Sequence, residues 1–192
     1  MVKNTEIKKQ IREEYLKLRA QIPAEEREIA QEKIADRLLD SGMFREARCI
    51  YIYAAFRAEA DTRRIIAESL RQKKRVAAPR VRGKHTMDFY FIKSMADLRP
   101  GFLGIPEPGP WCPKAPHPGP DVLMVMPGAA FDREGTRIGY GCGYYDVYLG
   151  PDPECSLAAL AFSSQITGSI PADAQDVRVR YIFTEKELIT CF

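Results

Sequence analysis

Histidine is scarce in this sequence of 192 residues, which contains only His85 and His117. Two imidazoles argue against a histidine base and against a metal site built from several histidines. The five cysteines are scattered and include no Cys-x-x-Cys pair, so we expect free thiols of a reducing compartment instead of a disulfide or zinc framework. No apolar run approaches the roughly 20 residues of a membrane span, and no hydrophobic stretch follows the charged amino terminus. These absences predict a cytoplasmic protein without a membrane partner.

The composition is that of an ordinary globular domain, with 45% hydrophobic and 29% charged residues. The chain is long enough to bury one good core and shows neither an internal repeat nor a second composition block, so we predict a single domain over residues 1–192. The net charge of +3 suits a small phosphate-bearing ligand but is too weak to predict nucleic-acid binding.

Hydrophobic periodicity indicates an α/β fold. A 3.6-residue period predicts a helix near residues 3–20, with Leu18 on its apolar face. A second helix is expected between Pro23, in its first turn, and Gly42 as its stop. Short apolar runs predict strands at 49–55, 75–79, 87–92, 121–126 and 156–162. Strands that alternate with helices favour a three-layer, Rossmann-like fold, in which an open and mostly parallel sheet carries helices on both faces.

Three glycines at alternate positions dominate the stretch from Arg137 to Asp146. Glycine lets the backbone approach a ligand closely, and a glycine-rich turn that opens a helix offers free N–H groups to an anion. Arg137 adds a positive charge, and Asp146 can bind a hard cation such as Mg²⁺. Tyr144 and Tyr145 offer flat faces to a ring system. The spacing G-x-G-x-G is neither the GxGxxG fingerprint nor a Walker A loop, so the glycines alone fit a ligand-free turn equally well.

Residues 127–149 read PGAAFDREGTRIGYGCGYYDVYL. This stretch resembles the signature P-G-x-x-F-D-x-x-G-x-R-[LI]-G-x-G-x-G-Y-Y-D of the family of 5-formyltetrahydrofolate cyclo-ligase, also called 5,10-methenyltetrahydrofolate synthetase. Residues 8–12 fit the family element K-x-x-[LI]-R, and residues 104–108 fit the element G-I-x-E-P. Residues 171–185 fit the closing pattern P-x-x-x-x-D-x-x-[VI]-x-x-[IV]-x-T-E. The resemblance covers nearly the whole chain.

This resemblance implies an enzyme that converts ATP and 5-formyltetrahydrofolate to 5,10-methenyltetrahydrofolate, ADP and phosphate. Its cofactor would be Mg²⁺, its partners would be the reduced folate and ATP, and we expect a monomer or a weak dimer. The residues that the resemblance implies to be catalytic are Lys8, Arg12 and Arg137, and the implied metal ligands are Asp146 and Asp176. The implied ATP-binding residues are Lys8, Lys9, Gln10, Ile11, Arg12, Arg137, Ile138, Gly139, Tyr140, Gly141, Cys142, Gly143, Tyr144 and Tyr145. The implied folate-binding residues are Ala54, Glu59, Glu107, Tyr140, Gly141, Cys142, Gly143 and Tyr144.

Plainer interpretations remain for single residues of this set. Two cations four residues apart, such as Lys8 and Arg12, usually form a solvated helix face. A loop glutamate such as Glu59 is more often solvated than functional. The family elements in which these residues stand favour the functional interpretation.

The chain departs from the family pattern at four positions. Cys142 stands where relatives usually have Lys or Gly, and Val147 stands where Arg is common. Arg180 replaces a usual acidic residue near Asp176, where its charge would weaken metal binding, and Ala54 replaces a larger apolar residue. These departures leave two alternatives open. One is a catalytically altered paralogue that binds folate or nucleotide, and the other is a different enzyme of phosphorylated metabolites on the same scaffold.

Overall fold

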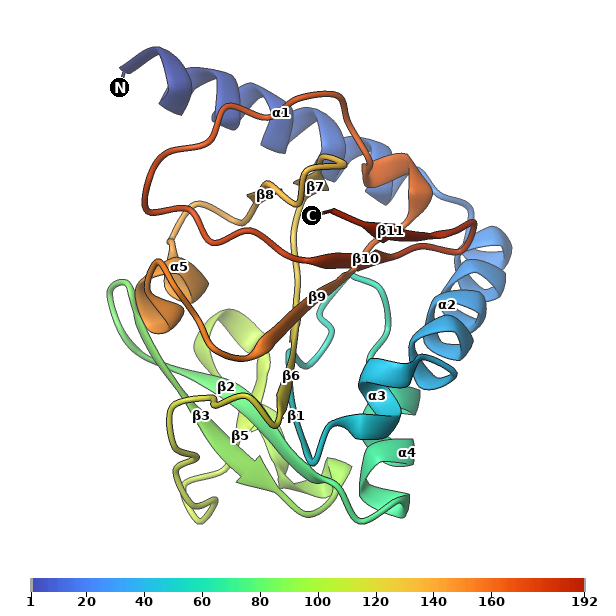
Figure 1. The fold of residues 1–192 in the computed structure, drawn as a ribbon, viewed down its shortest axis with the longest axis vertical. Coiled ribbons are helices and arrows are strands. Elements are labelled where there is room, and N and C mark those ends of the chain that lie inside the picture. Colours follow the sequence, from blue (N-terminus) through green and yellow to red (C-terminus); the bar gives the residue numbers. More distant parts are fainter. Residues whose placement is uncertain (1, 192) are drawn as a thin grey trace.

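A seven-stranded sheet forms the centre of the molecule, in the computed structural model of residues 2–191 (Figure 1). The strand order is β11-β10-β9-β6-β1-β2-β3; the five inner strands run parallel, and each edge strand is antiparallel to its neighbour. The strands are β1 (Cys49–Ile52), β2 (Arg75–Gly83), β3 (Thr86–Ile92), β6 (Val122–Met126), β9 (Ser156–Leu160), β10 (Tyr181–Phe183) and β11 (Leu188–Thr190). The predicted open, mostly parallel sheet is confirmed. Residues 1 and 192 of the predicted domain lie outside the described part.

Helices cover both faces of the sheet, as predicted, but unequally (Figure 1). The helices are α1 (Val2–Ala20), α2 (Ala24–Leu39), α3 (Gly42–Glu46), α4 (Arg63–Arg71) and α5 (Tyr144–Leu149). One face packs against α2, α3 and α4, whereas the other is covered by the short α5 and by irregular chain around Ala115. Helix α1 packs instead on a small hairpin of β7 (Ala130–Phe131) and β8 (Arg137–Ile138).

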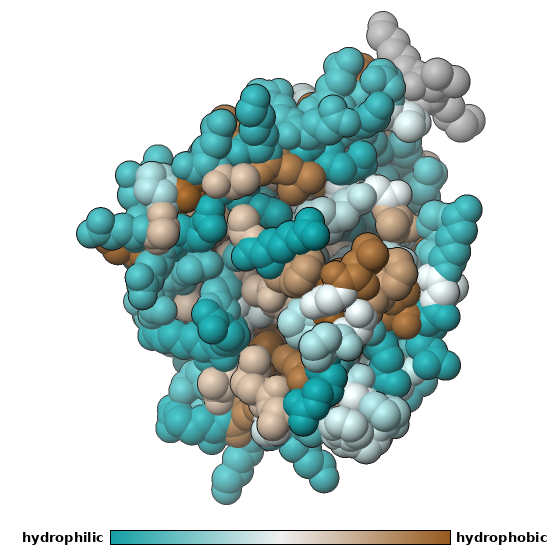
Figure 2. Space-filling view, turned by 180° about the vertical axis from the view of Figure 1, so that it is seen from behind, coloured by the Kyte–Doolittle hydropathy of each residue, from teal (hydrophilic) through white to brown (hydrophobic). Residues whose placement is uncertain are grey.

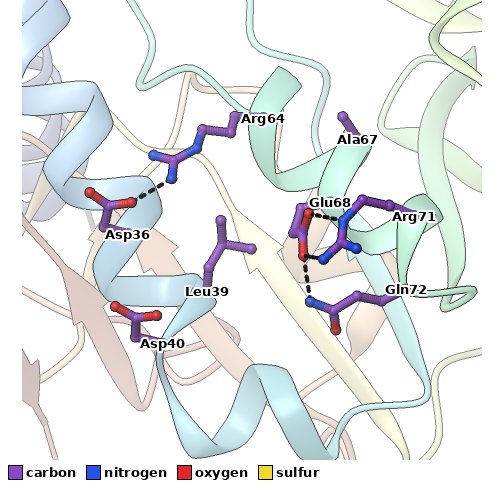
Figure 3. Close-up of a pocket in the computed structure, with 8 residues that line it drawn as sticks. All are labelled: Asp36, Leu39, Asp40, Arg64, Ala67, Glu68, Arg71 and Gln72. Carbon is purple, nitrogen blue, oxygen red and sulfur yellow. Dashed lines mark hydrogen bonds and ion pairs between the residues drawn. The ribbon is translucent and has the colours of Figure 1, made fainter.

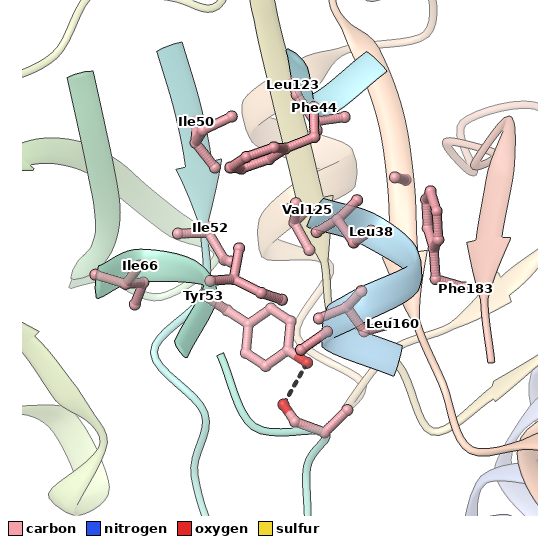
Figure 4. Packing of buried hydrophobic residues seen from close by; sticks show 14 of the residues in the cluster. Leu38, Phe44, Ile50, Ile52, Tyr53, Ile66, Leu123, Val125, Leu160 and Phe183 are labelled. Carbon is pink, nitrogen blue, oxygen red and sulfur yellow. Dashed lines mark hydrogen bonds between the residues drawn. The ribbon is translucent and has the colours of Figure 1, made fainter. Parts of the chain in front are cut away.

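Successive residues of β1 belong to different halves of the core. Ile50 and Ile52 pack with Leu38 of α2 and Phe44 of α3 in the cluster under the three helices (Figure 4). Tyr51 belongs to the cluster on the α5 side. Side chains alternate along a strand, and a strand that is covered on both faces is apolar at every position. This explains why the central strands read as continuous hydrophobic runs.

Several boundaries that the sequence predicts are wrong. Gly42 begins α3 and does not stop a helix, because the Ser41 hydroxyl accepts a hydrogen bond from the backbone N–H of Phe44 (3.2 Å) and caps the new helix. Pro23 lies at the N-cap of α2, one position before the first turn. Leu18 is 40% exposed and does not belong to the buried stripe of α1.

The sequence pattern also fails to predict the short strands. The strands without a sequence signal are β4 (Leu98–Pro100), β5 (Pro106–Pro108), β7, β8, β10 and β11. A segment of two or three residues is too short to show a period, so only its partner in space defines it.

The connections that leave β1 and β6 run in opposite directions. Strand β1 leads through α4 to β2, whereas β6 leads through α5 to β9 on its other side, although β1 and β6 are neighbours in the sheet. Neighbouring strands whose connections diverge leave a crevice at their carboxyl ends, where α/β proteins bind ligands. The loops that follow Ile52 and Met126 meet at this edge, and both carry predicted site residues.

The face seen from behind in Figure 2 is mostly hydrophilic, with hydrophobic residues in separate areas. The large apolar side chains are gathered mainly in the two halves of the sheet core. No helix in residues 2–191 combines the length and the apolar composition that crossing a membrane requires.

Truncation of Leu38 tests the packing of α2 on the sheet. Leu38 is 0% exposed, so we expect Leu38→Ala to lower the free energy of unfolding by about 2–5 kcal/mol. The matched control is Leu18→Ala, which truncates a leucine that is 40% exposed and should cost less than about 1 kcal/mol. Urea unfolding measures both values, and equal losses would contradict the placement of Leu38 in the core.

Candidate functional site

Glu59 lies in the turn after β1, at the carboxyl edge of the sheet. Its two carboxylate oxygens are held from different sides. The backbone N–H of Phe56 donates to Oε2 (2.8 Å), and the Tyr140 hydroxyl donates to Oε1. Tyr140 belongs to the glycine-rich stretch, so this contact joins two loops that are far apart in the sequence. The structure brings together two residues that were both predicted to bind folate.

Burial dominates the ionisation of this pair. It raises the pKa of the Glu59 carboxyl above its ordinary value, and the hydrogen bonds from Tyr140 and Phe56 and the charge of Arg19 only partly offset it. Burial, followed by the charge of Glu59, also raises the pKa of the Tyr140 hydroxyl. Tyr140 therefore stays protonated, and its hydroxyl donates a hydrogen bond to the carboxylate.

Arg137, at the start of the glycine-rich stretch, is buried and held by two partners. Its side chain is 4% exposed and donates through Nη2 to both carboxylate oxygens of Asp146 (3.2 Å each) and through Nη1 to Pro127 O (3.3 Å). Among the described residues its Nε has no hydrogen-bond partner. A Cβ on Gly139 would lie 2.7 Å from Nη1, so only glycine lets the backbone pass the guanidinium this closely.

The glycine-rich stretch runs beside Arg12 before it enters α5. Arg12 Nε donates to Gly139 O (2.7 Å), and a Cβ on Gly141 would lie 3.6 Å from the guanidinium carbon of Arg12. Gly141 has a φ of +100°, a conformation that residues with a side chain rarely adopt. Arg12 and this stretch were both predicted to bind ATP, and they lie side by side.

Lys8 is paired with two carboxylates of the closing segment. Its Nζ lies 2.6 Å from Asp173 Oδ2 and 2.5 Å from Asp176 Oδ2, and the Asp173 N–H donates to the same oxygen of Asp176 (2.9 Å). Burial by itself lowers the pKa of Lys8, but its hydrogen bonds to both aspartates and their charges raise the pKa overall. The hydrogen bond from Lys8 in turn lowers the pKa of Asp173. The site therefore holds a charged ammonium beside the ionised carboxylate of Asp173.

The two predicted metal ligands, Asp146 and Asp176, lie on adjoining segments. The N–H of Val177, next to Asp176, donates to Asp146 Oδ1 (3.1 Å). In the part of the chain that the structure describes, no three His, Cys, Asp or Glu side chains form a metal-binding group. Mg²⁺ usually takes one or two carboxylates together with phosphate oxygens and water. The two aspartates fit an ion that arrives with a phosphate ligand.

Two predicted residues contact the protein core or its strands. Glu107 is buried, and its Oε1 accepts a hydrogen bond from the Val81 N–H (3.1 Å), so it fastens β5 to β2. Ile11 packs against the small apolar cluster that contains Ile138 and links α1 to the β7–β8 hairpin.

The remaining predicted residues differ in exposure. Lys9, Gln10 and Cys142 are exposed, Tyr144 is half-buried, and Ala54 and Tyr145 are buried. In the described part of the chain the Tyr145 hydroxyl has no hydrogen-bond partner. Nδ1 of His85 lies 2.6 Å from the carbonyl oxygen of Cys142, so the glycine-rich stretch also contacts the β2–β3 hairpin.

Two charged residues of this region were missed at the level of sequence. Arg19 is 6% exposed and donates to Gly128 O (3.2 Å) and to the Tyr140 hydroxyl (3.0 Å). It stands two helical turns after Arg12, a spacing that places both cations on one face of α1 and could have drawn attention to it. Asp173 shares Lys8 with Asp176, and nothing in the sequence distinguishes it from a solvated aspartate.

A separate hollow of about 410 Å³ lies between α2 and α4, on the side of the sheet that α2, α3 and α4 cover (Figure 3). Arg64 pairs with Asp36 across it, and Arg71 pairs with Glu68 along α4. The hollow contains no predicted site residue, and both of its arginines are paired with carboxylates.

Similarity to known proteins identifies the family of this chain. Residues 4–185 match the 5-formyltetrahydrofolate cyclo-ligase family. The chain belongs to this family. It is 31% identical over 196 residues to a probable 5-formyltetrahydrofolate cyclo-ligase of Caenorhabditis elegans, with 96% of this chain and 95% of that protein covered. The mitochondrial 5-formyltetrahydrofolate cyclo-ligase of Arabidopsis thaliana is 30% identical over 185 residues, covering 82% of this chain and 66% of that protein.

A solved structure of the family has the same fold. The NMR structure of the 5,10-methenyltetrahydrofolate synthetase of Aquifex aeolicus matches with a TM-score of 0.81 at 31% identity, covering 96% of this chain and 93% of that chain. The predicted family, its α/β fold and the ligase class of the enzyme are confirmed. The roles of single residues, the oligomeric state and the cytoplasmic location stay predictions.

The raised pKa of Glu59 predicts a pH-dependent stability. The folded protein keeps the Glu59 proton to higher pH than the unfolded chain, so the free energy of unfolding falls as pH rises from the ordinary value of 4.5 through the folded pKa. Glu59→Gln does not titrate, and its stability relative to the wild type should therefore increase across this range. Urea unfolding at a series of pH values measures the difference.

The matched control for this measurement is Glu187→Gln. Its hydrogen bond with Arg133 lowers the pKa of Glu187, so the stability of this variant relative to the wild type should fall as pH rises. If the stability difference between Glu59→Gln and the wild type did not change with pH, this would contradict a pKa of the Glu59 carboxyl raised by burial.

Proposed function

We propose that this protein converts 5-formyltetrahydrofolate to 5,10-methenyltetrahydrofolate in a reaction that needs ATP and Mg²⁺ and releases ADP and phosphate. The observation that carries the proposal is the convergence of Arg12, Arg137 and Glu59 from three separate segments on one edge of the sheet. Two cations suit a polyphosphate, and a carboxylate suits the N–H groups of a pterin ring. The names of the two relatives at 30% and 31% identity support the same substrate.

The chemistry requires activation of a poor leaving group. The formyl oxygen attacks the γ-phosphorus of ATP, ADP departs, and an imidate phosphate forms on the folate. N10 of the folate then attacks the imidate carbon and loses its proton, the ring closes, and phosphate leaves with the former formyl oxygen. Phosphoryl transfer of this kind needs positioning and charge neutralisation more than a protein nucleophile. The scarcity of histidine is compatible with such a site.

The two ligands would bind on different sides of the glycine-rich stretch. The phosphates are held by the cations and backbone amides of Lys8, Arg12, Arg137 and residues 139–143. The pterin is oriented by Glu59 with Tyr140 and Tyr144. The hydrogen bonds that join Arg12 to Gly139 and Tyr140 to Glu59 support this division, because the same stretch contacts residues of both sets.

Mg²⁺ would be held by Asp146 and Asp176. When bound, it neutralises charge on the phosphate oxygens and makes the phosphorus a better target. The pairing of Lys8 with Asp176 fits a site for metal and phosphate together, since the ammonium attracts a phosphate oxygen and the carboxylate attracts the cation. Arg137 and Asp146 form a second pair of the same kind.

The reaction itself is the first test. We expect the absorbance of methenyl-folate to grow when the protein is mixed with 5-formyltetrahydrofolate, ATP and Mg²⁺, and to stay flat when any one of the three is left out. Binding of folate and ATP without growth would favour the catalytically altered paralogue. Absence of both turnover and folate binding would favour an enzyme of another phosphorylated metabolite.

Arg137→Lys tests the cation at the centre of the site. The substitution keeps a positive charge but loses the planar fork that bonds both Asp146 and Pro127, so we expect kcat to fall on the order of a hundredfold. The matched control is Arg133→Lys, at an exposed position of the same segment that pairs with Glu187, and its kcat should not change. An unchanged kcat in Arg137→Lys would remove Arg137 from the catalytic residues.

A further inference from the structure

Arg19 is a buried cation that the proposed mechanism does not use. It is 6% exposed, and its hydrogen bonds go to two neutral oxygens, Gly128 O (3.2 Å) and the Tyr140 hydroxyl (3.0 Å). Its Nε has no hydrogen-bond partner among the described residues. Burying a guanidinium with neutral partners is unfavourable for folding. A role in the site would explain why a charge stands there.

The contacts of Arg19 set the direction of a hydrogen-bond chain. Arginine only donates hydrogen bonds, so the Tyr140 oxygen must accept from Arg19. A hydroxyl has a single proton, and Tyr140 is left to donate it to Glu59 Oε1. Arg19 thereby fixes both the place of the Tyr140 hydroxyl and the direction in which it points. Its bond to Gly128 O ties the same arrangement to the end of β6.

Glu59 keeps acceptor capacity on both oxygens in this arrangement. A carboxylate has about four lone-pair positions, of which the Tyr140 hydroxyl uses one on Oε1 and the Phe56 N–H uses one on Oε2. One position remains on each oxygen. Two parallel acceptors of this kind match two neighbouring N–H groups, which the amino group and the adjacent ring nitrogen of a pterin provide.

We propose that Arg19 is a positioning residue for the folate, which holds Glu59 through Tyr140 in the orientation that accepts two N–H groups of the pterin ring. The inference rests on the proposed function, because it requires a pterin as the ligand of Glu59. Arg19 itself acts through Tyr140 and touches no substrate.

The charge of Arg19 adds a second, measurable effect. Ionisable groups from four elements interact with Glu59. Arg19 on α1 and Tyr140 in the glycine-rich stretch lower its pKa, and the charge of Glu59 in turn raises the pKa of Tyr53 after β1 and of Tyr145 on α5. Arg19 is the cation of this group, and it lowers the pKa of Glu59 against the effect of burial. Without it the carboxylate takes up a proton at higher pH, and a protonated Glu59 accepts the pterin poorly.

The test compares Arg19→Met with Arg27→Met. Arg27 also has a buried Nε without a partner among the described residues, and its Nη2 donates to the carbonyl oxygens of Arg19 (3.2 Å) and Ile22 (3.0 Å) at the end of α1. It supports the same helix but does not reach Tyr140. We expect Arg19→Met to raise KM for the folate on the order of tenfold, to leave KM for ATP unchanged, and to move the acid limb of kcat/KM to higher pH. Arg27→Met should change none of the three.

Two further variants keep the test decisive if Arg19→Met fails to fold. Arg19→Lys retains the charge but not the fork, so its acid limb should stay near that of the wild type while KM for the folate still rises. Tyr140→Phe removes the group through which Arg19 acts, so adding Arg19→Lys to it should raise KM for the folate no further. Independent, multiplying effects of the two substitutions would overturn the hydrogen-bond chain.

The outcomes separate this inference from the proposed function. Calorimetry of wild-type protein with 5-formyltetrahydrofolate comes first, because a wild type that neither binds nor converts the folate would overturn both. The other decisive result is a wild type that binds the folate while the Arg19 variants match Arg27→Met in KM and in pH profile. This result would overturn the positioning role alone.

Discussion

The parallel pairing of β1 with β6 is the constraint on which the rest of the site depends. The register sets Ile52 opposite Val125, so both strands end at nearly the same level. The turn with Glu59 and the segment that leads to Arg137 leave the sheet from these two ends. A slip of one residue would exchange the two faces of a strand and bring buried side chains to the wrong half of the core. The apolar core therefore fixes the distance between the two halves of the site.

Three charged groups of the site have partners of their own inside the protein. Arg137 has Asp146, Lys8 has Asp173 and Asp176, and Glu59 has the Tyr140 hydroxyl. Such pairing offsets part of the free energy that is lost when charges leave water, and it fixes each group before a ligand arrives. The groups keep unused donors or acceptors, so a ligand can add to these contacts without breaking all of them. The site is ordered by its own residues.

Predictions from the sequence are most successful where the role of a residue depends on its neighbours in the chain. The buried central strands follow from uninterrupted apolar runs, and the glycine-rich stretch follows from backbone geometry and family resemblance. Arg19 and Asp173 were missed because their importance comes from partners more than a hundred residues away. Gly42 was assigned to the wrong end of a helix because Ser41 caps the next helix at that point. Local patterns give the elements, whereas the pairing of charges appears only after the elements have packed.

The ion pairs of Lys8 join residues that are 165 and 168 positions apart, nearly the length of the chain. Helix α1 leaves the ribosome well before the segment with both aspartates, and contacts between such distant segments form late in folding. Until that segment is made, the ammonium of Lys8 therefore stays without these two carboxylates. This part of the site is assembled only after residues 173–177 have been made, so a chain that stops before them has neither the ion pairs nor the Val177 contact.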